Sequence, residues 1–224
     1  MVQKNNGKRR GAPPGVPAAE PEAPAKRGRP RAFATEVALA RAMDTFRDSG
    51  FAGTSLDDLS AAMGINRPSL YGAFGDKREL FGKAYERYRA EMAEQFAAAF
   101  APDLTLRQAL EKAYATAIAV YSAGENGPRG CFTVMTAASE VMADERLRET
   151  VTAALASTDR AMLRLFERAR ERGELPPDAD VAALAPLAAS VFHSLAVRAR
   201  ARAPRAELEA LARGAVALLC TQAR

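Results

Sequence analysis

Residues 54–77 (TSLDDLSAAMGINRPSLYGAFGDK) constrain the fold of this chain more than any other stretch. Thr54 or Ser55 can cap a short helix, because a side-chain oxygen at that position accepts hydrogen bonds from the free N–H groups of the first turn. That helix is expected to stop at Gly64, and Asn66 can cap a second helix. Two short helices joined by a tight glycine turn form a helix-turn-helix, so the sequence predicts that motif here.

The surrounding segment, residues 35–80, resembles the DNA-binding domain of the TetR/AcrR-type transcriptional regulators. The resemblance is carried by Gly64, Ile65, Asn66, Arg67, Pro68, Ser69, Leu70 and Tyr71, followed by Phe74, Lys77 and Leu80. It implies a regulator, by default a repressor, that binds double-stranded operator DNA. It also implies contacts to bases or backbone by Arg67, Pro68 and Ser69, and to phosphates by Tyr71 and Lys77.

The residues themselves add further candidate DNA contacts. A helix N-terminus offers free N–H groups and a favourable dipole to a phosphate, so Thr54 and Ser55 are candidate phosphate contacts. Arg67 opens the second helix, and its guanidinium fork matches O6 and N7 of guanine. Glycine inside a helix costs about 1 kcal/mol relative to alanine, so we expect Gly72 to serve a close approach of the backbone to DNA.

The positive charge of the chain is concentrated in its N-terminal tail. The net charge is +5, whereas residues 1–34 alone carry eight basic and two acidic residues. Residues 1–32 are rich in proline and poor in large apolar side chains, so we expect a disordered basic arm. An extended Arg-Gly-Arg-Pro segment is narrow enough for the minor groove, where Arg27, Arg29 and Arg31 can follow its negative potential. The alternative is a solvated basic tail without sequence preference.

Composition favours an all-α protein of the reducing cytoplasm. Hydrophobic residues make up 48% of the 224 residues, and no run of alternating β-branched residues occurs. The two cysteines, Cys131 and Cys220, are too few for a disulfide framework or a zinc site, so no cofactor is expected. The longest uncharged run, residues 181–197, is shorter than the roughly 20 apolar residues of a membrane span. No metal-ligand cluster, nucleophile elbow or phosphate loop supports an enzyme.

The helix pattern divides the chain into an arm (1–32), a DNA-binding domain (33–80) and a helical domain for ligand binding and dimerisation (81–224). The first helix is expected from a cap near Thr35 to Ser49. A long helix from about Asp76 to Phe100 belongs to both domains and is a candidate lever. Further helices are predicted over residues 105–123, 131–142 and 144–172.

Two last helices, residues 178–201 and 205–222, are predicted to form half of a four-helix homodimer interface. The first is apolar nearly all round. The second carries Leu208, Leu211, Ala215 and Leu218 at coiled-coil-like spacing. A dimer also suits the function, because one short recognition helix reads only a few base pairs.

An apolar cavity between helices of the second domain is the expected site for a small-molecule effector. The candidate lining residues are Phe96, Phe100, Tyr114, Tyr121, Cys131, Phe132, Met135, Phe166 and His193. Each of them is also a plausible core residue. Cys131 is either a reactive thiol or a small buried apolar residue.

The function predicted from the sequence is a repressor released from a palindromic operator by a small apolar or aromatic molecule. Two alternatives stay open. One is a redox-responsive repressor that senses through Cys131, and the other is an architectural DNA-binding protein that relies on the Arg-Gly-Arg-Pro arm.

Overall fold

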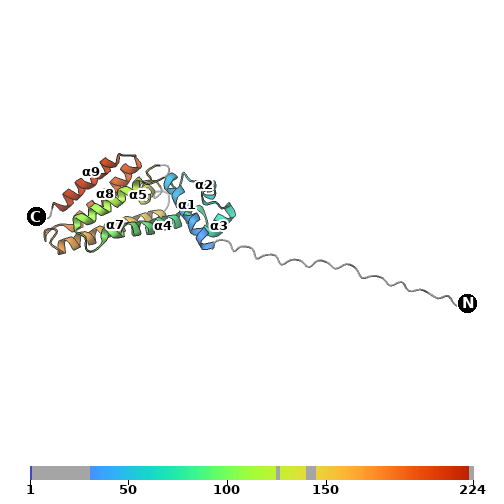
Figure 1. Cartoon of the computed structure of the whole chain (residues 1–224), viewed down its shortest axis with the longest axis horizontal. Coiled ribbons are helices and arrows are strands. Elements are labelled where there is room, and N and C mark those ends of the chain that lie inside the picture. Colours follow the sequence, from blue (N-terminus) through green and yellow to red (C-terminus); the bar gives the residue numbers. More distant parts are fainter. Residues whose placement is uncertain (2–30, 125–126, 140–144, 222–224) are drawn as a thin grey trace.

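The computed structural model describes residues 1, 31–124, 127–139 and 145–221, and within those ranges the chain is all-α without a strand. The elements are α1 (Arg31–Ser49), α2 (Leu56–Met63), α3 (Arg67–Phe74), α4 (Lys77–Ala97), a 3-10 turn η1 (Ala98–Phe100), α5 (Leu106–Ser122), α6 (Phe132–Ser139), α7 (Glu145–Glu171), α8 (Val181–Arg200) and α9 (Arg205–Cys220). Figure 1 shows α1, α2 and α3 together at one end of the molecule, with α4 running from them toward the other helices. The fold class predicted from the sequence is confirmed.

The helix-turn-helix forms for the local reasons that the sequence indicates. Ser55 caps α2 in a capping box with Asp58, whose carboxyl pKa is lowered by hydrogen bonds from the Ser55 hydroxyl and backbone N–H. Gly64 follows α2 with φ 67°, a left-handed conformation in which a side chain is unfavourable. The Asn66 side chain then accepts a hydrogen bond from the Ser69 N–H and caps α3. Each turn of the motif is therefore fixed by its own residues.

A single hydrophobic core holds α1, α2, α3 and the first half of α4 together. It buries Ala42, Met43, Phe46, Leu59, Met63, Leu70, Phe74, Leu80, Phe81, Ala84, Tyr85 and Tyr88. Phe132, the first residue of α6, belongs to the same core. The Phe132 ring lies 5.3 Å from Phe81, 5.5 Å from Tyr85 and 5.5 Å from Tyr88, centroid to centroid. The N-terminal helices, hereafter the head (α1–α3), are therefore anchored on side chains of α4 and α6.

The second half of the molecule is built around α5. This helix packs against α8 and α9, and α8 also packs along α7. By length and composition alone α8 could cross a membrane, although its uncharged run over residues 181–197 is shorter than a typical membrane span. In the structure, however, α8 is a core helix that buries Val181, Ala185, Ala188, Ala189, Phe192, Leu195, Ala196 and Ala199 between its neighbours.

Some helix boundaries differ from the sequence prediction. α1 begins at Arg31 and not near Thr35, because Arg31–Ala34 are themselves residues that tolerate or favour helix. α4 ends at Ala97, and Phe100 lies in the 3-10 turn that follows. The predicted helix over residues 131–142 is described as α6 up to Ser139, and its remainder lies outside the described ranges.

Candidate nucleic-acid interface and effector cavity

The outer face of α3 presents five of the predicted DNA contacts above a buried base. Leu70 and Phe74 are buried beneath the helix, whereas Arg67, Pro68, Ser69, Tyr71 and Gly72 are exposed. The Tyr71 side chain stays 48% exposed although it is a large aromatic residue. A Cβ atom at Gly72 would meet no atom within 4 Å, so packing inside the protein gives no reason for glycine there. This face of α3 is therefore exposed on the surface of the head.

Arg67 is held in place before any DNA is bound. Its Nε donates to Oδ1 of Asp57 at 2.9 Å, and its Nη2 lies 2.7 Å from Oδ2 of the same carboxylate. Both side chains are largely exposed, at 54% and 76%. An exposed pair of this kind contributes only about 0.2–1 kcal/mol, so the guanidinium can exchange Asp57 for a stronger partner at little cost.

Thr54 does not fit the role of a phosphate contact. The residue is 2% exposed, and its hydroxyl donates to the Gly50 carbonyl oxygen at 2.6 Å. Its backbone N–H donates to the Phe51 carbonyl oxygen. The sequence could not distinguish Thr54 from Ser55 as the cap, and only Ser55 lies on the exposed surface.

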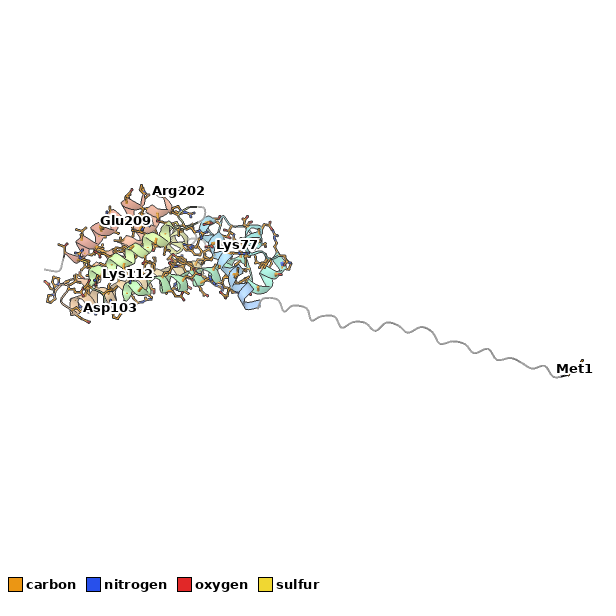
Figure 2. The ribbon with its side chains drawn as sticks, in the orientation of Figure 1. Met1, Lys77, Asp103, Lys112, Arg202 and Glu209 are labelled. Carbon is orange, nitrogen blue, oxygen red and sulfur yellow. The ribbon has the colours of Figure 1, made fainter. Side chains whose placement is uncertain are left out.

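Lys77 lies at the start of α4 on the head side of the molecule, as Figure 2 shows. Its Nζ is 4.3 Å from the centroid of the Phe51 ring, a cation–π contact that orients the ammonium group without neutralising it.

Of the predicted arm residues, Arg27 and Arg29 lie outside the described ranges. Arg31 is the first residue of α1, so it is helical and not part of an extended segment.

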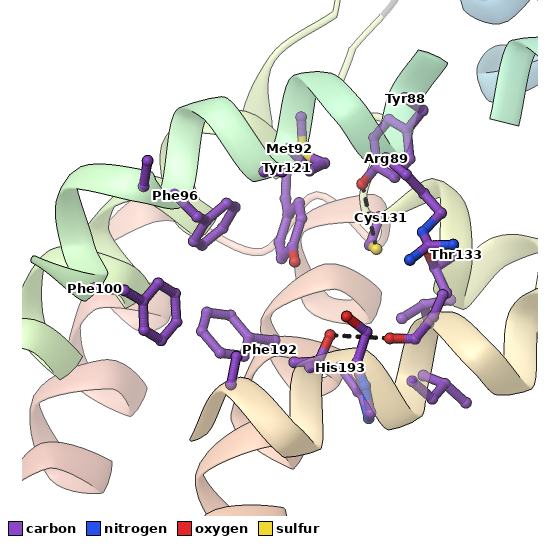
Figure 3. A pocket seen from close by; sticks show the side chains of 18 residues that line it. Tyr88, Arg89, Met92, Phe96, Phe100, Tyr121, Cys131, Thr133, Phe192 and His193 are labelled. Carbon is purple, nitrogen blue, oxygen red and sulfur yellow. Dashed lines mark hydrogen bonds between the residues drawn. The ribbon is translucent and has the colours of Figure 1, made fainter. Parts of the chain in front are cut away.

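A cavity of about 320 Å³ lies between α4, α6, α7 and α8. Figure 3 shows it from close by. Five of the nine predicted lining residues do line it, namely Phe96, Phe100, Tyr121, Cys131 and His193. The volume is at the lower end of the range for small-molecule sites, about 300–1,000 Å³.

The other four predicted lining residues lie elsewhere, because they complete the packing of helices against one another. Tyr114 is fully buried in the core formed by α5, α7, α8 and α9, hereafter the second core, where its hydroxyl donates to the Ala188 carbonyl oxygen at 2.9 Å. Phe166 is fully buried in the same core. Phe132 belongs to the core that anchors the head, and Met135, although half-buried, does not reach the cavity.

Sequence reasoning missed the remaining lining, which comprises Tyr88, Arg89, Met92, Ala93, Ala97, Thr133, Val134, Ala154, Leu155, Ser157, Thr158, Ala161 and Phe192. The helical repeat of α4 could have identified part of it. Tyr88, Met92 and Phe96 are four residues apart on one face, and Arg89 and Ala93 lie beside them. The residues from α7 are small or polar, apart from Leu155, and carry no such signal.

Tyrosine hydroxyls and Cys131 meet at one end of the cavity. The Tyr88 hydroxyl donates to Sγ of Cys131 at 3.4 Å and accepts the Phe132 backbone N–H at 3.3 Å. Burial, followed by the neighbouring Cys131, raises the pKa of Tyr88 and of Tyr121 well above the usual value of tyrosine. Both phenols are therefore neutral at physiological pH and act as hydrogen-bond donors.

The loop before α6 connects the cavity to the head through Arg129. Its Nη1 lies 2.6 Å from Oδ1 of Asp44, and its Nε lies 2.6 Å from Oδ1 of Asp48, both on α1. The Arg129 side chain is only 12% exposed. Burial alone would lower the pKa of Arg129, but the hydrogen bond that Arg129 donates to Asp48 and the charges of both carboxylates raise it. Two residues later in the chain, Cys131 lines the cavity.

Replacing Arg129 with glutamine should lower the free energy of unfolding by about 1–3 kcal/mol, because two carboxylates lose a charged, mostly buried partner. Denaturant unfolding at a fixed protomer concentration measures this loss. Arg198→Gln is the matched control, since Arg198 pairs with Glu207 where both side chains are about half exposed, and it should cost less than about 1 kcal/mol. Equal losses in the two variants would contradict a special role for the Arg129 contacts.

Comparison with known proteins agrees with this geometry. The family model described as "Bacterial regulatory proteins, tetR family" matches residues 38–84, and the one described as "Tetracyclin repressor-like, C-terminal domain" matches residues 108–215. The chain is 31% identical to the HTH-type transcriptional repressor ComR of Escherichia coli K12 over 78% of this chain and 83% of ComR. It is 30% identical to the HTH-type transcriptional regulator YezE of Bacillus subtilis 168 over 70% of this chain and 81% of YezE.

Solved structures show the same relationship. A cysteine mutant of the TetR family transcriptional regulator CifR, complexed with 26-bp double-strand operator DNA, is 33% identical and superposes with a TM-score of 0.76, over 84% of this chain and 98% of CifR. A TetR transcriptional regulator from Chloroflexus aurantiacus J-10-FL has a TM-score of 0.77 at 24% identity, over 86% of this chain and 97% of the other, and supports the fold alone. The head, the long α4 and the helical second domain, together with these matches, show that the chain belongs to the tetR family of bacterial regulatory proteins.

Proposed function

We propose that this protein is a cytoplasmic, homodimeric transcriptional repressor that binds a palindromic operator and is released from it by a small apolar or aromatic molecule. The observation that carries the DNA-binding part is the outer face of α3, which exposes Arg67, Ser69, Tyr71 and Gly72 above a buried Leu70. The 33% identical CifR mutant was solved in complex with operator DNA, which supports DNA binding by this chain as well. Regulators of this family are not enzymes, and the proposal assigns no catalysis.

Binding of the purified protein to the DNA flanking its own gene tests the first part. The titration is made with and without excess nonspecific competitor and at several salt concentrations, because phosphate contacts make affinity fall with salt. A competitor-resistant complex that protects a palindrome is the expected result. Binding that disappears with competitor and depends entirely on residues 1–31 would favour the architectural alternative.

The dimer interface is proposed on α8 and α9, where apolar side chains remain exposed. Leu187 and Val197 on α8 are 59% and 52% exposed, and Leu218 on α9 is 75% exposed. Leu211, Gly214 and Leu218 share one face of α9, and a Cβ atom at Gly214 would meet nothing within 4 Å. Leu208 was predicted on this face but is buried, because it packs with Ala212, Val216 and Leu219 into the second core.

Leu218→Glu is expected to convert the dimer to monomers and to weaken operator binding in parallel. In a two-fold symmetric interface both copies carry the substitution, so two carboxylates would be buried against apolar surface without partners. Light scattering after size exclusion measures the mass of the particle. Gln95→Glu adds the same charge on an exposed position of α4 and should leave the dimer intact. A Leu218→Glu dimer of unchanged affinity would place the interface on other helices.

The effector part of the proposal rests on the cavity and its place along α4. Tyr88, Met92 and Phe96 line the cavity, while Leu80 and Phe81 on the same helix are buried against the head. A molecule that favours one position of α4 therefore favours one position of the head. The change in operator affinity that the molecule causes cannot exceed the ratio of its own affinities for the two states.

Thiol chemistry at Cys131 is the second candidate signal. Cys131 is half-buried, lines the cavity and accepts the Tyr88 hydroxyl hydrogen bond, so a modification of Sγ would disturb the α4–α6 contact directly. Cys131→Ser distinguishes the two signals. A response to oxidants that survives the substitution would remove this candidate, whereas an effector response that survives it would support the first one.

A further inference from the structure

The cavity has two chemically different ends. Phe96, Phe100 and Phe192 lie at one end in Figure 3, with the Phe96 and Phe192 rings in edge contact at a centroid distance of 5.8 Å. Arg89, Cys131 and Thr133 lie at the other end. A molecule that fills both ends must therefore be apolar at one extremity and polar at the other.

The charged side chains around the cavity determine whether the polar group of the ligand should be negative or positive. Among the described residues that line the cavity there is no aspartate and no glutamate, and Arg89 is the one side chain with a permanent charge. Within the described ranges Arg89 pairs with no carboxylate, whereas Arg87 on the same helix pairs with Glu36 and Glu91. Burial lowers the pKa of His193, although the charge of Asp159 partly opposes this, so His193 is neutral at physiological pH.

Hydrogen-bond donors reinforce the preference for an anion at the Arg89 end. The Thr133 hydroxyl accepts a hydrogen bond from the Tyr85 hydroxyl at 2.9 Å, so its own proton is directed to another acceptor. Burial raises the pKa of Tyr85 to about 12, which keeps that phenol a donor. Thr133 is also in the first turn of α6, where the helix dipole is positive. An oxyanion would find donors and positive charge here, and no aspartate or glutamate among the described lining residues competes for them.

We propose that the effector is an amphiphilic carboxylate whose aromatic or short alkyl body lies among Phe96, Phe100 and Phe192 and whose carboxylate binds Arg89 and Thr133. The guanidinium fork takes a carboxylate through two parallel hydrogen bonds. Because Arg89 is exposed, water partly solvates its contact with the carboxylate, and the pair contributes less to binding than a buried pair would. This inference rests on the proposed function, since it names the class of molecule that the cavity senses.

The test uses sets of three probes that share a body and differ in charge, with the full-length protein. One set is 2-naphthoate, 2-naphthamide and 2-naphthylmethylammonium, and the other is decanoate, decanamide and decylammonium. Calorimetry measures binding, and release of operator DNA is measured in parallel. We expect the carboxylate of at least one set to bind about 10-fold more tightly than its amide, as a charged hydrogen bond allows, with the ammonium compound weakest.

Arg89→Gln is expected to lower carboxylate affinity to that of the amide and to leave amide affinity unchanged. Lys112→Gln is the charge-matched control, because Lys112 is exposed on α5 outside the cavity lining (Figure 2) and should change neither affinity. Equal binding of carboxylate and amide, or a preference that survives Arg89→Gln, would overturn this inference. If the probes still release the operator in either of those cases, the proposed function stands without the carboxylate inference. Absence of binding by all six probes would count against the cavity as a sensor and against the proposed function itself.

Discussion

Arg67→Ala is expected to lower specific operator affinity by at least about 30-fold. A bidentate contact between arginine and guanine contributes about 1–3 kcal/mol, and a dimer on a palindrome loses two of them. Affinity for nonspecific DNA should change much less, because that binding comes from phosphate contacts. Titration of operator and nonspecific duplexes at one salt concentration measures both quantities.

The ion pair with Asp57 provides the control for this experiment. Arg67→Ala removes a candidate DNA contact and also the contact between α2 and α3, whereas Asp57→Asn removes the charged pair and keeps the arginine. We expect Asp57→Asn to retain operator affinity or to raise it, since the guanidinium is then free. If both substitutions weaken binding equally, Arg67 acts by holding α2 against α3 and some other residue reads the bases.

Phe81→Ala is expected to lower the free energy of unfolding by about 3–5 kcal/mol, the usual cost of removing a fully buried phenylalanine ring. The Phe81 ring is completely buried and lies 5.0 Å from Phe46, 5.3 Å from Phe51 and 5.3 Å from Phe132. It therefore contacts α1, the loop after α1, and α6 at the same time. Chemical denaturation at a fixed protomer concentration measures the loss.

Tyr71→Ala is the matched control for Phe81→Ala, because it truncates an aromatic residue on the exposed face of the head. Its effect on stability should stay within about 0.5 kcal/mol, while its effect on DNA binding can be large. A Phe81→Ala protein as stable as Tyr71→Ala would mean that the head does not depend on the aromatic cluster. Phe81→Leu retains most of the volume and should recover part of the loss.

The head could be predicted from the sequence because each of its turns is determined by residues close together in the chain. The Ser55 cap, the left-handed Gly64 and the Asn66 cap act over three or four residues, and such patterns are visible in a sequence. The cavity depends on which of several apolar faces remain unfilled after packing. Tyr114 and Phe166 are as aromatic and as suitably spaced as Phe96 and Phe100, and yet they fill the core. Thr133, Ser157 and Thr158 line the cavity and look like ordinary helix residues in the sequence.

The position of Phe132 in the core of the head limits how this protein can be recombined with its relatives. A boundary after residue 80, as the sequence suggests, separates α1–α3 from Phe81, Tyr85 and Tyr88, and so removes part of their own hydrophobic core. A head that is transferred to another protein will keep its stability only if α4 as far as Tyr88 is transferred with it. The recipient must also supply an aromatic ring in the place of Phe132. Hybrid regulators built by joining at the end of the signature motif should fold poorly even when both parents are stable. The head and the effector cavity of this protein are therefore expected to be inherited as one unit.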